Sequence, residues 1–236
     1  MGFDIAAAME RLEERITKAC LRSGRKREEV SLMGVSKFID LETVEEAAKQ
    51  GLRLFGESRV QEGVKKFSAY RERHTDEEET QVHLIGSLQR NKAKAAADFF
   101  DCIQSVDRQP LMDELGRLTI AREKPLLILL EYHTGEESKA GFPDFDALLR
   151  GAEKALSFPG IRLGGLMTIA PFTDNTGLVR SSFRSLAKAR DELRKRFSEA
   201  AWPCLSMGMS GDFEIAIEEG SSLVRIGSAL FGERPL

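Results

Sequence analysis

The chain has 236 residues, of which 35 are basic and 38 acidic, so its formal net charge is −3 at pH 7. With 42% hydrophobic residues it is too apolar and too nearly neutral to be disordered. So small a net charge gives no bulk attraction to nucleic acid or to a membrane surface. The longest purely apolar run, Leu126 to Leu130, is far too short to span a bilayer.

The chain opens with an amphipathic helix and then alternates between short apolar runs and helical segments. The opening helix is indicated by Ile5, Met9, Leu12, Ile16 and Ala19, which recur at helical spacing before Ser23-Gly24 ends it. Strands are predicted at residues 30–36, 52–56, 82–86, 101–106, 125–132, 161–167, 203–206 and 222–226. Helices are predicted at residues 41–50, 60–73, 91–99, 109–122, 144–156, 175–197 and 213–219.

Eight strands that alternate with helices, joined by short connections, are typical of a parallel sheet. In a chain of this length they predict an α/β fold, a single (β/α)8 barrel over residues 1–236 with one extra helix at the N-terminus. The alternative is an open doubly wound sheet, which shares the alternation and differs in strand order.

The N-terminal segment lacks the continuous apolar stretch of a signal peptide. The cysteines are far apart and form no C-x-x-C pair: Cys20, Cys102 and Cys204. This pattern indicates a reducing compartment, so we expect a cytoplasmic protein. The histidines are equally scattered at positions 74, 83 and 133, and we expect no metal site. Because no long exposed apolar stripe is evident, we expect a monomer.

The active site of a (β/α)8 barrel lies at the C-terminal ends of its strands. Ser58, His83 and Met167 lie at or near three of these ends, and we expect them to line the site. Lys37 follows the first strand. A lysine at the apolar mouth of a barrel is desolvated, which favours the neutral amine and a Schiff base with a carbonyl. The alternative is a lysine that extends into solvent, and position alone favours that alternative.

Two turns of small residues follow the seventh and eighth strands. Ser206 to Ser210 and Gly227-Ser228 offer backbone N–H groups and hydroxyls, and these loops are the usual phosphate site of such barrels. The alternative is ordinary capping of helix N-termini by Ser210 and Ser228.

Arg225 lies inside an apolar strand and therefore needs a buried partner. That partner is either a glutamate of the barrel or a ring nitrogen of a ligand. An amine-reactive lysine, a phosphate site and a partner for a ring nitrogen are together the contacts that pyridoxal 5′-phosphate (PLP) needs.

Seven segments carry a resemblance that covers essentially the whole chain: Gly34 to Lys37, Phe55 to Glu57, His83 to Lys92, Gly135 to Gly141, Gly165 to Met167, Leu205 to Ser210 and Val224 to Gly232. On these segments the sequence resembles the pyridoxal phosphate homeostasis proteins, the YggS/PROSC family, which are related to the barrel domain of alanine racemase.

The resemblance implies that Lys37 holds PLP as a Schiff base and that Arg225 faces the pyridine nitrogen. It also implies that the phosphate is bound by Ser206, Met207, Gly227 and Ser228. Because arginine stays protonated and cannot protonate the ring, the ring is a poorer electron sink. The family is regarded as lacking robust catalysis and as storing PLP or delivering it to PLP-dependent apoenzymes.

The sequence departs from the family pattern at three places. Ser58 replaces an asparagine, Phe38-Ile39-Asp40 replaces Thr-x-Pro, and Tyr132 replaces another asparagine. The first departure predicts a lost hydrogen bond near the cofactor, and the second a changed loop shape.

The alternative function is a PLP-dependent amino-acid racemase with weak activity. Racemases of the alanine racemase kind take a second base, a tyrosine, from a C-terminal domain. The eighth strand and its helix lie close to Leu236, so we expect slow turnover or none. A cofactor-free Schiff-base aldolase is disfavoured because its lysine usually lies on a later strand. A binding module without a small ligand leaves Arg225 unexplained.

Overall fold

The computed structural model describes residues 3–74, 80–136, 140–197 and 202–232. Residues 137–139, which belong to one of the segments that carry the resemblance, lie outside the described residues. Within the described residues the strands are β1 (Ser31–Val35), β2 (Leu54–Glu57), β3 (Gln81–Leu84), β4 (Cys102–Val106), β5 (Leu126–Glu131), β6 (Ile161–Met167), β7 (Cys204–Ser206) and β8 (Leu223–Ile226).

The strands form a closed parallel barrel in sequence order. The closure is made by β1 and β8, where Ser31 pairs with Leu223 and Gly34 with Ile226. This pairing confirms the predicted (β/α)8 barrel and excludes the open doubly wound sheet, whose outer strands do not meet.

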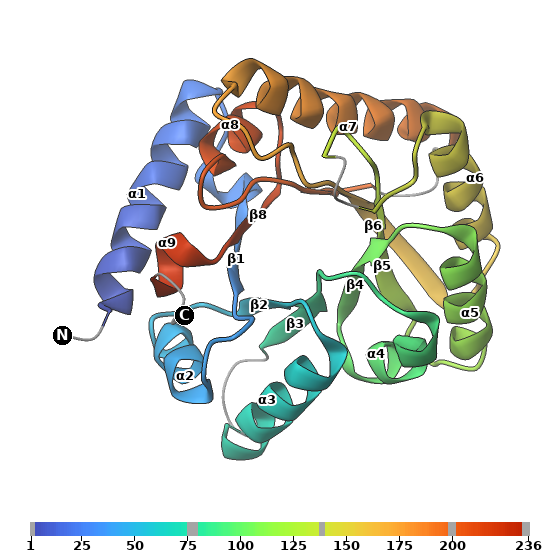
Figure 1. The fold of residues 1–236 in the computed structure, drawn as a ribbon, viewed down its shortest axis with the longest axis horizontal. Helices are drawn as coiled ribbons and strands as arrows, with labels where there is room; N and C mark the ends of the chain where they lie inside the picture. Colours follow the sequence, from blue (N-terminus) through green and yellow to red (C-terminus); the bar gives the residue numbers. More distant parts are fainter. Residues whose placement is uncertain (1–2, 75–79, 137–139, 198–201, 233–236) are drawn as a thin grey trace.

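Helices surround the barrel on the outside (Figure 1). They are α1 (Ile5–Arg22), α2 (Leu41–Lys49), α3 (Val60–Arg73), α4 (Ala93–Phe99), α5 (Gln109–Thr119), α6 (Phe145–Leu156), α7 (Thr176–Arg196), α8 (Phe213–Glu218) and α9 (Ser228–Phe231), with short 3-10 turns η1 (Arg27–Glu29) and η2 (Arg90–Lys92). The predicted extra helix is α1. Asp4 caps it by accepting a hydrogen bond from the N–H of Ala7, and its apolar face packs against α8 and α9.

The interior of the barrel holds an apolar cluster and a set of buried polar side chains. The cluster consists of Cys102, Leu129 and Met167. The polar side chains lie mostly at the C-terminal ends of the strands: Ser36, Glu57, His83, Gln104, Glu131, Thr168, Ser206 and Arg225. Because buried polar groups carry a free-energy cost unless they are hydrogen-bonded, this end is where a site is expected.

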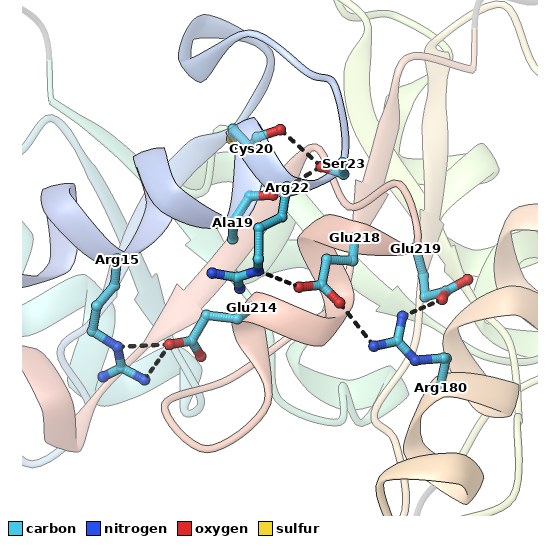
Figure 2. A network of polar contacts seen from close by, with 9 residues as sticks. All are labelled: Arg15, Ala19, Cys20, Arg22, Ser23, Arg180, Glu214, Glu218 and Glu219. Atoms are coloured by element: carbon cyan, nitrogen blue, oxygen red, sulfur yellow. Dashed lines mark hydrogen bonds and ion pairs between the residues drawn. The ribbon is translucent and has the colours of Figure 1, made fainter.

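Ion pairs hold α8 from two sides (Figure 2). From α1, Arg15 pairs with Glu214 at 2.7 Å and Arg22 with Glu218 at 2.9 Å. From α7, Arg180 reaches both Glu218 at 2.8 Å and Glu219 at 2.5 Å. Each pair contributes little alone, but charges that share partners form a network. The basic residues of α7 that face α8 therefore bind carboxylates of the same chain.

Gly165 marks a place where two strands come unusually close. Its φ is +147°, and a Cβ at this position would lie 2.0 Å from the carbonyl oxygen of Cys204 on β7. Gly165→Ala should lower the free energy of unfolding by about 3 kcal/mol, since neither the conformation nor the space suits a side chain. Urea unfolding measures the change. Gly211→Ala, with nothing within 4 Å of the added carbon, is the control, and equal stabilities of the two variants would contradict the explanation.

Candidate functional site

A cavity of about 1110 Å³ opens at the C-terminal ends of the strands. Its wall is formed by the ends of β1, β5 and β8 and by the loops after β2, β3, β6 and β7. Five of the residues predicted for the site line it: Lys37, Ser58, Arg225, Gly227 and Ser228. The structure thus brings these five residues together in one cavity, at the end of the barrel where the sequence predicts the site.

Lys37 lies in the turn after β1 and shares the cavity wall with Val35. The changed loop predicted for Phe38-Ile39-Asp40 has a specific form. Phe38 adopts φ = +64°, in the left-handed region, and Asp40 caps α2 by accepting a hydrogen bond from the N–H of Thr43 at 2.8 Å. The sharp turn ends the strand at the cavity and sends the chain directly into α2.

Arg225 forms the buried floor of the cavity, with 4% of its surface exposed. Its Nη1 donates to the carbonyl oxygen of Ser206 at 2.6 Å and to the Ser206 hydroxyl at 2.7 Å, and its Nη2 donates to the carbonyl oxygen of Thr168 at 2.7 Å. No carboxylate of the described residues forms an ion pair with it. Of the two partners that the sequence left open, a barrel glutamate is therefore not the one observed.

Burial lowers the pKa of Arg225 from its ordinary value because the charged form is desolvated. The nearby carboxyl groups of Asp212 and Glu131 act in the opposite direction. Arginine remains charged in proteins, so the floor of the cavity carries a permanent positive charge. The guanidinium has five N–H groups, and the hydrogen bonds within the described residues use three of them.

A chain of hydrogen bonds crosses the barrel from Arg225 to His83. The Ser206 hydroxyl donates to Oε1 of Gln104 at 2.6 Å, so the other end of that amide donates to Nδ1 of His83 at 2.9 Å. This direction places the imidazole proton on Nε2, which is buried and has no partner in the described part of the chain. Burial lowers the pKa of His83 to about 4, so the ring is neutral at pH 7.

Four residues predicted for the site do not line the cavity: His83, Met167, Ser206 and Met207. Ser206 and His83 instead support Arg225 from inside the barrel. The N–H of Met207 donates to the carbonyl oxygen of Leu223 at 3.2 Å, and Met167 packs in the apolar interior. Their predicted contacts with a cofactor stay predictions.

The two loops expected to bind phosphate come together at the cavity wall. The backbone N–H groups of Ser210, Gly211 and Gly227 have no acceptor within the described residues, and all three residues line the cavity. Gly208 makes the first loop possible, with φ = +96° and a Cβ position only 2.6 Å from Cβ of Ala216. Backbone N–H groups without an acceptor, gathered in this way, are the chemistry that an anion-binding site requires.

The sequence placed Ser210 in the predicted phosphate loop and left open ordinary helix capping as the alternative, whereas Gly211 was not predicted. Ser210 does not cap α8, whose N-cap is Asp212. Its hydroxyl instead accepts from the N–H of Ala229, at 3.3 Å, in the first turn of α9.

Tyr132 does not line the cavity. Its hydroxyl bonds to Ser185 on α7, and burial raises its pKa. Nothing in this placement favours the role of a second base for racemisation.

The chain is similar to one class of known barrel proteins. The family model for the N-terminal domain of alanine racemase matches residues 9–235. The alanine racemase of E. faecalis superimposes with a TM-score of 0.69 at 17% identity, over 99% of this chain and 60% of that chain, a likeness of fold. The protein is thus a barrel of the alanine racemase N-terminal domain class, with a lysine after β1 and an arginine on β8.

The chain belongs to the family of pyridoxal phosphate homeostasis proteins. It is 41% identical to the member from Aquifex aeolicus over 226 residues, 96% of each chain. It is 37% identical to the member from Vibrio cholerae over 227 residues, 96% of this chain and 94% of the other. The structure of PipY from Synechococcus elongatus, with PLP bound, matches with a TM-score of 0.82 at 31% identity, over 97% of this chain and all of that one.

The buried neutral His83 predicts a pH-dependent stability. An unfolded histidine has a pKa near 6.5, whereas the folded value is about 4. Between these values the unfolded chain binds a proton that the folded chain does not, so the free energy of unfolding falls as pH falls. The contribution of this residue is about 2 kcal/mol between pH 7 and pH 5.

Urea unfolding of the wild type and of His83→Gln at both pH values measures this contribution. The variant should lose less stability than the wild type on acidification, by about 2 kcal/mol. An identical loss in both proteins would show that His83 does not resist protonation.

Proposed function

We propose that this protein binds pyridoxal 5′-phosphate through a covalent bond to Lys37 and serves to hold the cofactor rather than to turn over a substrate. The observation that carries the proposal is a buried arginine that forms no ion pair with any carboxylate of the described residues, on the floor of a cavity that Lys37 also lines. A charge in that position is stabilised when a ligand supplies the missing acceptor.

The residues of the cavity fit the three polar parts of this cofactor. Lys37 would hold the aldehyde carbon, and the N–H groups of Ser210, Gly211 and Gly227 would bind the phosphate. Arg225 retains two N–H groups with which to meet the ring nitrogen. When bound, the aldehyde condenses with a primary amine to a Schiff base and water, and the ring can accept electron density.

A permanently charged arginine donates to the ring nitrogen and does not protonate it. This weakens the ring as an electron sink, which supports a holding role over catalysis. The relatives named pyridoxal phosphate homeostasis proteins support the same role. We propose PLP-dependent apoenzymes as the recipients of the cofactor.

The proposal includes the cellular compartment and the oligomeric state of the protein. We infer that it acts in the cytoplasm, which the three free thiols support. No helix among the described residues is long and apolar enough to cross a membrane. We also propose a monomer. In support, the large exposed apolar side chains of the described residues come from several separate segments of the chain: Phe3, Leu21, Phe38, Ile120, Leu156, Phe172 and Leu178.

The protein loaded with PLP and then freed of unbound cofactor should be yellow, with an absorbance band that is shifted from that of the free aldehyde and that Lys37→Ala abolishes. The physical reason is that a Schiff base with the lysine amine changes the conjugated system of the aldehyde and retains the cofactor on the protein. Lys65→Ala, a change at an exposed lysine of α3, should keep the band. A band that persists in Lys37→Ala would overturn the assignment of the lysine, and rapid racemisation of alanine by the loaded wild type would overturn the holding role.

A further inference from the structure

Two residues of α3 hold the backbone on both sides of Lys37. Nζ of Lys66 donates to the carbonyl oxygen of Ser36 at 2.6 Å, and Oε1 of Glu62 accepts from the N–H of Phe38 at 2.6 Å. The residues before and after Lys37 are thus bound to two side chains one helical turn apart.

The cation of this pair is itself fixed by a buried carboxylate. Lys66 has 9% of its side chain exposed and lies 2.8 Å from Oε1 of Glu57, which is fully buried at the end of β2. The same oxygen accepts from the Ser36 hydroxyl at 2.8 Å, and Lys66 also lies 3.5 Å from Glu62. The three donors of the ammonium group therefore each have an acceptor, at Ser36, Glu57 and Glu62.

Stability alone does not account for this arrangement. Burying an ion pair costs desolvation that its attraction often fails to recover, and here Oε2 of Glu57 has no hydrogen-bond partner in the described residues. Desolvation raises the pKa of Glu57, against the effect of Lys66 and Ser36. Such a pair is better explained by the geometry that it imposes.

The imposed geometry is a strained turn. Phe38 has φ = +64°, a conformation that costs a residue with a side chain about 1 kcal/mol or more. The short hydrogen bond to Glu62 opposes relaxation of this turn, and the guanidinium of Arg59 covers the Phe38 ring at 5.1 Å. Lys37 therefore lies between Ser36, which the ammonium group of Lys66 fixes, and Phe38, which the carboxylate of Glu62 fixes.

We propose that Lys66 and Glu62 are positioning residues, which fix the direction in which the side chain of Lys37 leaves β1 and enters the cavity. The inference rests on the proposed function, since it concerns the bond between Lys37 and the cofactor. It assigns to α3 a role in covalent capture that is separate from binding of the ring and the phosphate.

Comparing the binding of two ligands shows whether Lys66 positions Lys37 or only stabilises the fold. PLP needs Lys37 for its covalent bond, whereas pyridoxine 5′-phosphate has the same ring and phosphate but no aldehyde. In Lys66→Met, binding of PLP should weaken about tenfold or more, as expected for loss of a charge-assisted hydrogen bond. Binding of pyridoxine 5′-phosphate should stay unchanged. Lys65→Met, the same change at the exposed neighbour, should affect neither ligand.

A second variant tests the hydrogen bond on the other side of Lys37, and it does so without leaving a buried charge unpaired. Glu62→Ala removes the acceptor of the Phe38 N–H from a side chain that is 24% exposed, so the fold should tolerate it. Amide hydrogen exchange at Phe38, measured without any cofactor, should accelerate about tenfold or more. Gln61→Ala, at an exposed neighbour, should leave the exchange unchanged. Glu62→Ala should also weaken PLP binding selectively.

Equal weakening of both ligands in Lys66→Met, or unchanged PLP binding, would overturn the positioning role. If Lys66→Met does not fold, the same two ligands tested on Glu62→Ala decide the matter. Absence of the absorbance band in the wild type would instead defeat the proposed function, and unchanged exchange at Phe38 in Glu62→Ala would defeat the inference independently.

Discussion

Arg225 carries a permanent charge into the interior of the barrel, and the polar interior is arranged around it. Among the described residues, the guanidinium donates to neutral oxygens of Ser206 and Thr168 and forms no ion pair. A chain of side chains then continues through Gln104 to a neutral His83. A charge held by dipoles instead of a carboxylate keeps its electrostatic attraction for an acceptor in the cavity. The positive charge on the floor of the cavity is therefore local, and a net charge of −3 conceals it.

Two sets of contacts from outside the barrel shape the cavity, one of ion pairs and one of hydrogen bonds from charged side chains to the backbone. On one side, α1 and α7 hold α8, and with it the loop that carries Ser210 and Gly211 (Figure 2). On the other side, α3 holds the turn that carries Lys37. The extra helix α1 thus has a structural task that follows from its place beside α8 and α9 (Figure 1). Rigid elements outside the barrel position groups that act inside it.

Periodicity predicted the fold almost completely, because alternation of strands and helices over this length admits few arrangements. The position of Lys37 after a strand and the charge of Arg225 within one were visible for the same reason. The hydrogen bonds of Ser206 and Met207 could not be predicted, because they join strands that are distant in sequence. The support of Lys37 by Lys66 was equally hidden, because a lysine on an amphipathic helix usually faces solvent.

We propose that Lys37, held between α3 and the barrel, is the covalent anchor of the cofactor. Reduction of the PLP-loaded protein with borohydride, followed by mass spectrometry of its peptides, tests this assignment at the level of the single residue. We expect one pyridoxyl adduct per chain, on the peptide that contains Lys37. An adduct on a different lysine, or an unmodified chain after reduction, would contradict it.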